Sequence, residues 1–197
     1  MSTSRENLRL ASRIIASGGL VVFPTDTVYG LGCDPTDERA VGRVFLVKKK
    51  ARAPLPVLGS GINSLRSLCR FSERSLRVAE AFWPGKVTIV LPTRRNVPAA
   101  ADRDTVGVRV PDNPVTLDLI ERSGGILVGT SANVTGREPP ANVNGAFSQL
   151  GEAVDLYLDG GETLGVPSTV VDFAGDEPHL LRRGAVTFDE ILKELGN

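Results

Sequence analysis

The stretch LVVFPTDTVYGLG, residues 20–32, decides the fold because a buried strand ends in it and a polar turn follows. Residues 20–23 are an apolar run typical of a buried strand. Residues 24–32 then bring hydroxyls, a carboxylate and glycines at positions 30 and 32. Ligands of open α/β sheets lie beyond the carboxyl ends of strands, and glycine lets a backbone approach closely or adopt a positive φ. We therefore expect a binding site here, the alternative being an ordinary strand-to-loop turn.

The composition indicates one globular domain. The chain has 197 residues, enough for a full hydrophobic core, and we predict a single domain over residues 1–197. The net charge is zero, so nothing attracts the whole domain to nucleic acid. No apolar run approaches the roughly 20 residues of a membrane span, and no signal-peptide pattern is present. We therefore expect a cytoplasmic protein without membrane contact.

The rare residue types narrow the chemistry. Cys33 and Cys69 are too few and too far apart for a disulfide framework, and we expect reduced thiols. The single histidine, His179, lies in an alternating stretch. A strand-edge histidine is a better interpretation than a catalytic triad or a histidine-rich metal site, which would depend on that one residue. We predict no metal ligands among the side chains.

Hydrophobic periodicity predicts strands that alternate with helices. Helices are expected to begin near residues 3, 37, 72, 114 and 187, at capping or acidic residues. Strands are expected at 20–23, 55–58, 87–91, 106–110, 126–129, 169–173 and 179–182. This order, with hairpin-like strands towards the end, predicts an α/β fold with a twisted, mixed parallel and antiparallel sheet flanked by helices.

Polar side chains follow several of the predicted strands, and cations lie near them. Hydroxyls and amides beside cations suit an anionic, polar ligand such as a nucleotide with a small carboxylate. The sequence contains neither a P-loop nor a dinucleotide-binding glycine pattern, so scattered side chains would have to form a phosphate site. These side chains are Thr25, Thr27, Tyr29, Lys48, Lys49, Lys50, Arg52, Arg109, Ser131, Asn133, Ser168, Thr169 and Arg182.

Seven sequence blocks, in order, resemble the threonylcarbamoyl-AMP synthase family, also called the YrdC-like domain. The resemblance covers nearly the whole chain and is closest to single-domain members of the family. The blocks are PTDTVYGLG (24–32), KKKAR (48–52) before PLPVL (54–58), FWPG (82–85), VRVP (108–111), TSAN (130–133) with Gly136, STVVD (168–172) and LRRG (181–184).

The resemblance implies a nucleotidyltransferase that makes threonylcarbamoyl-AMP and pyrophosphate from L-threonine, bicarbonate and ATP, with Mg²⁺ accompanying the ATP. A downstream threonylcarbamoyl transferase would then pass the group to a tRNA adenosine. It also implies a YrdC-like fold with a basic concave face, through which tRNA or another RNA would make contact.

Site residues are likewise implied by the resemblance. The expected threonine ligands are Thr27, Arg109, Thr130 and Ser168, with the substrate carboxylate on Arg109. The expected ATP ligands are Lys48, Lys50, Arg52, Ser131, Asn133 and Arg182, of which Lys48 and Lys50 would also act in catalysis.

The chain departs from the family pattern around residues 48–52, where the loop is about one residue shorter. Either Lys50 replaces the family arginine and loses its bidentate fork, or Arg52 has taken that role. Taken without the other blocks, Lys48 to Lys50 would be a solvated helix C-terminus, where lysines suit the macrodipole. Lys86 also stands where an apolar residue or proline is common in the family.

Two other functions compete with the synthase. The first is a YrdC-like RNA-binding module that makes no adenylate; the low aromatic content, 5%, counts against base stacking. The second is a related enzyme that forms a carbamoyl-adenylate from carbamoyl phosphate. For that enzyme we would expect zinc-finger and acylphosphatase-like extensions, which this sequence does not include.

Overall fold

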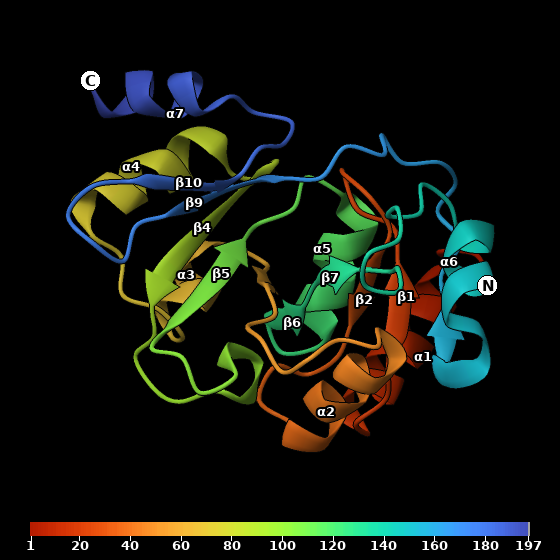
Figure 1. The fold of residues 1–197 in the computed structure, drawn as a ribbon. Helices are drawn as coiled ribbons and strands as arrows, with labels where there is room; N and C mark the ends of the chain where they lie inside the picture. Colours follow the sequence, from red (N-terminus) through yellow and green to blue (C-terminus); the bar gives the residue numbers. More distant parts are fainter. Residues whose placement is uncertain (197) are drawn as a thin grey trace.

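The structure is a computed structural model that describes residues 1–196 (Figure 1). Its helices are α1 (Arg5–Ala16), α2 (Glu38–Val47), α3 (Ile62–Arg66), α4 (Glu73–Phe82), α5 (Pro114–Arg122), α6 (Val143–Leu150) and α7 (Phe188–Leu195), with short 3-10 turns at Pro98–Ala100 and Gly151–Ala153. Its strands are β1 (Val21–Phe23), β2 (Gly30–Gly32), β3 (Val57–Gly59), β4 (Val87–Pro92), β5 (Thr105–Arg109), β6 (Ile126–Val128), β7 (Thr130–Ser131), β8 (Leu156–Tyr157), β9 (Thr169–Asp172) and β10 (His179–Arg182).

The strands form two sheets, each with parallel and antiparallel pairs. The larger has the order β10-β9-β4-β5-β3-β6 and the smaller β7-β2-β1-β8. The predicted α/β class with mixed pairing is confirmed, but the strands divide between two sheets where we expected one. The short strands β2, β7 and β8 were not predicted, because two or three residues carry no readable period. The helices α3 and α6 were not predicted either. That residues 1–197 form one domain stays a prediction, and its last residue lies outside the described part.

The opening motif folds into a β1–β2 hairpin. Val21 pairs with Gly32 and Phe23 with Gly30, in antiparallel register. Neither glycine has a positive φ, contrary to one of our two expectations. Both are instead sites of close approach within the protein: a Cβ on Gly30 would lie 2.9 Å from the Phe23 ring, and one on Gly32 would lie 2.5 Å from the Val128 carbonyl oxygen. Gly32 therefore lets the two sheets pack together, whereas Gly30 makes room for the Phe23 ring of the neighbouring strand.

Helices cover both sheets and bury the strand faces. Figure 1 shows α4 and α7 side by side next to β9 and β10, whereas α1 and α5 pack together near β1. The largest apolar cluster runs from Val22 and Leu31 in the small sheet to Ile89 and Val108 in the large one, so one core joins the two. Within residues 1–196, every helix is too short or too polar to cross a membrane.

Candidate functional site

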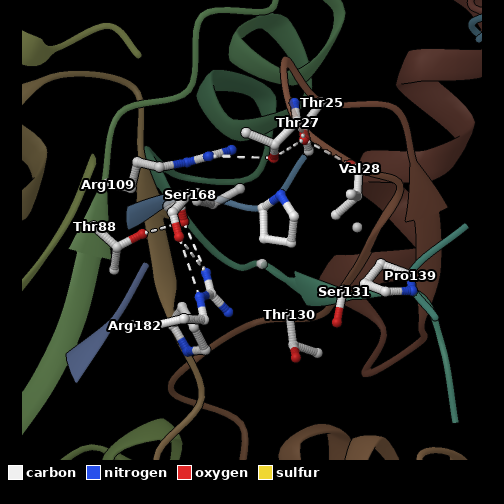
Figure 2. A pocket seen from close by; sticks show the side chains of 15 residues that line it. Thr25, Thr27, Val28, Thr88, Arg109, Thr130, Ser131, Pro139, Ser168 and Arg182 are labelled. Atoms are coloured by element: carbon white, nitrogen blue, oxygen red, sulfur yellow. Dashed lines mark hydrogen bonds between the residues drawn. The ribbon is translucent and has the colours of Figure 1, made fainter. Parts of the chain in front are cut away.

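A cavity lies between the two sheets, where the β1–β2 turn faces the ends of β3, β4 and β5 (Figure 2). Its free volume is about 100 Å³, several times the space that one water molecule needs. Hydroxyls and two guanidinium groups provide most of its polar lining. The lining residues are Thr25, Thr27, Val28, Gly30, Pro56, Leu58, Thr88, Arg109, Gly129, Thr130, Ser131, Pro139, Pro167, Ser168 and Arg182.

Arg109 is the most deeply buried cation of the cavity. It ends β5 and is 4% exposed. Its Nη2 donates to Asp26 Oδ1 at 3.0 Å in a buried ion pair, and its Nη1 donates to Thr27 Oγ1 at 3.3 Å. Burial lowers the pKa of Arg109, while the Asp26 carboxylate acts in the opposite direction by favouring the charged form. The guanidinium therefore stays charged and is held at two of its nitrogens.

The β1–β2 turn is held by its own threonines. Thr25 Oγ1 donates to the Val28 carbonyl oxygen at 2.6 Å and lies 2.9 Å from Thr27 Oγ1. The Thr27 amide also donates to Thr25 Oγ1 at 3.1 Å. From outside the turn, the Gly165 amide donates to the Thr27 carbonyl at 2.8 Å. These contacts fix the Thr27 hydroxyl at the cavity wall.

Arg182 holds the opposite wall. From β10 its Nε and Nη2 donate to the Ser168 carbonyl oxygen at 3.1 and 2.8 Å, and Nη2 also donates to Ser168 Oγ at 3.0 Å. Gly184 makes this possible, because a Cβ there would lie 2.3 Å from the Ser168 carbonyl carbon. In the described part of the chain Arg182 forms no salt bridge, and it remains partly exposed. It therefore brings an uncompensated positive charge to the cavity.

Thr88 completes that wall from β4. It is 4% exposed, and its Oγ1 lies 2.9 Å from Ser168 Oγ. Gly107 on the neighbouring strand accommodates the Thr88 methyl group, since a Cβ on Gly107 would lie 3.2 Å from it. Thr88, Ser168 and Arg182 therefore form one hydrogen-bonded row along the cavity (Figure 2).

Lys48 lies behind the cavity rather than in its lining. It is 3% exposed, and its Nζ donates to the Asn133 carbonyl oxygen at 2.8 Å and to the Ser131 carbonyl oxygen. Burial, with a smaller contribution from Lys50, lowers the pKa of Lys48 to about 8. Lys48 thus ties the end of α2 to the β7 segment, whose residues Thr130 and Ser131 line the cavity.

The remaining predicted nucleotide ligands are outside the cavity lining. Lys49 adopts a left-handed conformation, φ 49°, just after the end of α2, and this turns the chain before Lys50. Arg52 forms exposed ion pairs with Asp102 at 3.2 Å and Glu38 at 3.9 Å. The Asn133 side chain donates to the backbone of the following loop, with its Nδ2 2.6 Å from the Arg137 carbonyl oxygen.

The structure therefore brings together six of the ten predicted site residues: Thr27, Arg109, Thr130, Ser131, Ser168 and Arg182 line one cavity, and Lys48, Lys50, Arg52 and Asn133 do not. Sequence reasoning missed Asp26 and Thr88. Asp26 was quoted in the motif without a role, although a carboxylate beside a buried strand was a readable signal. Thr88 lies within an apolar β-branched strand, and nothing in the sequence distinguishes it.

The side chains around the cavity do not form a cation site by themselves. In residues 1–196, no group of three or more His, Cys, Asp or Glu side chains is arranged to hold a metal ion. Among the cavity-lining residues of that part there is no carboxylate, and the nearby Asp26 is engaged with Arg109. His179 is exposed on β10, in agreement with the predicted strand-edge histidine.

Comparison with known proteins gives a consistent result. The Sua5/YciO/YrdC family profile, described as "Telomere recombination", matches residues 13–184. The chain is 39% identical to the threonylcarbamoyl-AMP synthase of Pyrococcus abyssi and 33% identical to that of Bacillus subtilis, over 96% and 100% of its length. It spans only 57% and 58% of those two relatives.

A solved structure supports the same relationship. The crystal structure of P. abyssi Sua5 complexed with L-threonine superposes on this chain with a TM-score of 0.94, at 37% identity. The match covers 98% of this chain and 58% of that one. With a profile match over most of its length and relatives above 30% identity, the chain belongs to the Sua5/YciO/YrdC family.

Proposed function

We propose that this protein is an L-threonylcarbamoyladenylate synthase, which makes threonylcarbamoyl-AMP and pyrophosphate from L-threonine, bicarbonate and ATP. The observation that carries the proposal is a small cavity with two guanidinium groups and a row of hydroxyls, which suits a small carboxylate ligand next to a phosphate. The printed names of the relatives, and the L-threonine bound to P. abyssi Sua5, support the same substrate for this chain.

In this proposal the amino acid occupies the cavity. Arg109 binds its carboxylate through the guanidinium N–H groups that Asp26 and Thr27 leave free, while Thr27, Thr130 and Ser168 contact its polar groups. Burial strengthens these contacts, because a charge-assisted hydrogen bond is stronger where little water competes.

The nucleotide would lie on the Arg182 side of the cavity and extend outwards. Ser131 and Arg182 would contact it within the cavity, and Lys50 and Arg52 would contact its triphosphate beyond. Asn133, whose Nδ2 donates to the Val134 and Arg137 carbonyl oxygens, would support the loop next to the nucleotide. The exposed ion pairs of Arg52 are weak enough to be exchanged for phosphate oxygens. Lys48 would support the Ser131 segment from behind and stabilise charge at longer range. Mg²⁺ would arrive with the triphosphate, in keeping with its preference for phosphate oxygens over protein-only sites.

The chemistry needs positioning and charge stabilisation rather than a protein nucleophile. The threonine amine attacks carbon dioxide and loses a proton to give a carbamate; with bicarbonate the same carbamate forms with loss of one water molecule. A carbamate oxygen then attacks the α-phosphorus and pyrophosphate leaves. Both steps gather negative charge, which the two arginines would stabilise while they hold the reactants together. Pro139 and Pro167 in the cavity wall would help to exclude water from the short-lived carbamate.

Incubation of the protein with ATP, bicarbonate and labelled threonine tests the proposal, with pyrophosphate and the adenylate as products. Serine should be a better alternative substrate than 2-aminobutyrate, because a site that hydrogen-bonds a hydroxyl penalises its loss more than the loss of a methyl group. Equal activity with all three amino acids would argue against the threonine assignment. RNA binding without any adenylate would favour the RNA-binding module, and product from carbamoyl phosphate would favour the related carbamoyl-adenylate enzyme.

A further inference from the structure

Asp26 and Arg109 form a buried ion pair that is not optimised for stability. Their side chains are 6% and 5% exposed. Asp26 Oδ1 accepts from Arg109 Nη2, but among residues 1–196 nothing donates to Asp26 Oδ2, which is fully buried. A buried carboxylate oxygen without a donor is costly, and a buried ion pair is weak evidence for a stabilising role. The cost of this pair suggests that it has a role in the adjacent cavity, which Arg109 lines.

The hydrogen bonds of the turn have a fixed direction. Thr25 Oγ1 uses its one proton on the Val28 carbonyl oxygen, 2.6 Å away. In the 2.9 Å contact between the two hydroxyls, Thr27 must therefore be the donor and Thr25 the acceptor. Arg109 Nη1 donates to that same Thr27 oxygen. The Thr27 hydroxyl proton is therefore already donated to Thr25 Oγ1, so towards the cavity Thr27 can only accept a hydrogen bond.

The guanidinium is consequently held by two consecutive residues. Asp26 engages Nη2 and Thr27 engages Nη1, so rotation of the planar group would break both contacts. The N–H bonds that remain point along a fixed direction, next to an oxygen that accepts but does not donate. A carboxylate beside a donor group, the arrangement of every α-amino acid, is complementary to this pair.

We propose that Asp26 is a positioning residue for amino-acid recognition, which orients the Arg109 guanidinium for a ligand carboxylate while Thr27 accepts a hydrogen bond from the ligand's ammonium or hydroxyl group. This inference rests on the proposed function and deepens it. The competing role for Asp26 is charge neutralisation of a buried arginine. The two roles make opposite predictions, because a neutralising carboxylate competes with the ligand for Arg109, whereas a positioning carboxylate assists it.

The first experiment compares Asp26→Asn with Asp112→Asn. Asp112 is an exposed carboxylate in the shallow depression on the other side of Asp26, so its substitution removes the same charge nearby without a contact to Arg109. Positioning predicts that Asp26→Asn raises the threonine KM tenfold or more and leaves the ATP KM within twofold. Inhibition by acetate should weaken by a smaller factor than the affinity for threonine. Asp112→Asn should behave as wild type. A threonine KM that is unchanged or lower in Asp26→Asn overturns the inference.

A second variant keeps the charge. Asp26→Glu retains a carboxylate to compensate Arg109, so the fold should survive, but the longer side chain meets the guanidinium at a different place. Positioning predicts a raised threonine KM here too, whereas neutralisation predicts the wild-type value. A wild-type threonine KM in this variant overturns the inference, and unfolding midpoints measured alongside show that the protein is folded.

A third measurement is independent of activity. Nitrogen-15 NMR of the arginine guanidinium groups should show separate, slowly exchanging Arg109 Nη signals in the wild type and averaged signals in Asp26→Asn. Averaged signals in the wild type overturn positioning whatever the enzyme does. If the wild type forms no adenylate but its Arg109 signals are resolved, the proposed function fails while the orienting role of Asp26 stands.

Discussion

The two arginines of the cavity differ in their burial and in the groups that hold their side chains. Arg109 lies at the end of a central strand, is 4% exposed and is paired with the buried carboxylate of Asp26. Arg182 lies on the edge strand β10, is partly exposed and, among residues 1–196, binds the backbone and hydroxyl of Ser168 without an acidic partner. The same residue type therefore supplies a fixed, compensated donor on one side and a free positive charge on the other.

Because of this difference, one arginine of the site provides a fixed direction for hydrogen bonding and the other provides an uncompensated positive charge. A guanidinium held by two neighbours gives direction and selects a planar carboxylate. A guanidinium without an acidic partner attracts any anion, and its charge adds to the field of the cavity. The following variants test this contrast, in order of decreasing effect.

Removal of Arg109 should have the largest effect, on stability. Arg109→Met leaves the Asp26 carboxylate buried without its counter-charge, which should lower the free energy of unfolding by about 3–5 kcal/mol. The double variant Asp26→Asn with Arg109→Met removes both charges and should recover much of that loss. Urea unfolding of the three proteins measures both effects. If the double variant is no more stable than Arg109→Met, the pair is not coupled in the way proposed.

Lys48, which lies behind the cavity and contacts the β7 segment, should make stability depend on pH. Its pKa falls from 10.5 to about 8 on burial, so between these values the unfolded chain binds a proton that the folded protein does not. The contribution of Lys48 to the free energy of unfolding therefore rises with pH from about 8 to 10.5, by about 3 kcal/mol.

The comparison of wild type with Lys48→Met isolates this effect. Burial raises the pKa of Cys33 and Cys69 to about 12, which lowers stability at high pH, but this loss is common to both proteins and cancels in the difference. Urea unfolding at several pH values should give a stability difference that is flat below pH 8 and grows above it. A difference that is independent of pH would contradict the proton linkage.

Arg182 should affect ligand binding more than stability. Loss of a charge-assisted contact with a phosphate should cost about 1.5–3 kcal/mol of ATP binding in Arg182→Met, measured by calorimetry. Its bonds to Ser168 are partly exposed, so we expect the unfolding free energy to fall by only about 1 kcal/mol. Unchanged ATP affinity would remove Arg182 from the nucleotide site, and a stability loss as large as that of Arg109→Met would remove the contrast.

Thr88 should give the smallest effect. Thr88→Val keeps the shape of the side chain but removes one hydroxyl from the Ser168 row, which should cost about 1 kcal/mol of stability. Because Arg182 still holds Ser168 through its backbone oxygen, ATP binding should change by less than threefold. A larger loss would mean that the hydroxyl row, and not the guanidinium, keeps Ser168 in place.

Part of the fold and of the site could be predicted from the sequence, because the signals concerned act between residues close together in the chain. Val21 to Phe23, Val87 to Leu91 and the helix starting after Thr187 are all where periodicity and capping place them, because side-chain pattern and N-cap chemistry act over a few residues. The family blocks likewise selected Arg109, Ser168 and Arg182, which the structure brings to one cavity.

The sequence by itself determined the α/β class, the family and the chemical character of the site: hydroxyls and cations after buried strands. Only the tertiary structure decided the division into two sheets, the inward turn of Lys48 and the pairing of Asp26 with Arg109, residues 83 positions apart. The reason is that burial and ion pairing depend on which segments meet in space. A local pattern specifies that a charge is present, whereas the packing of distant strands determines whether it is compensated.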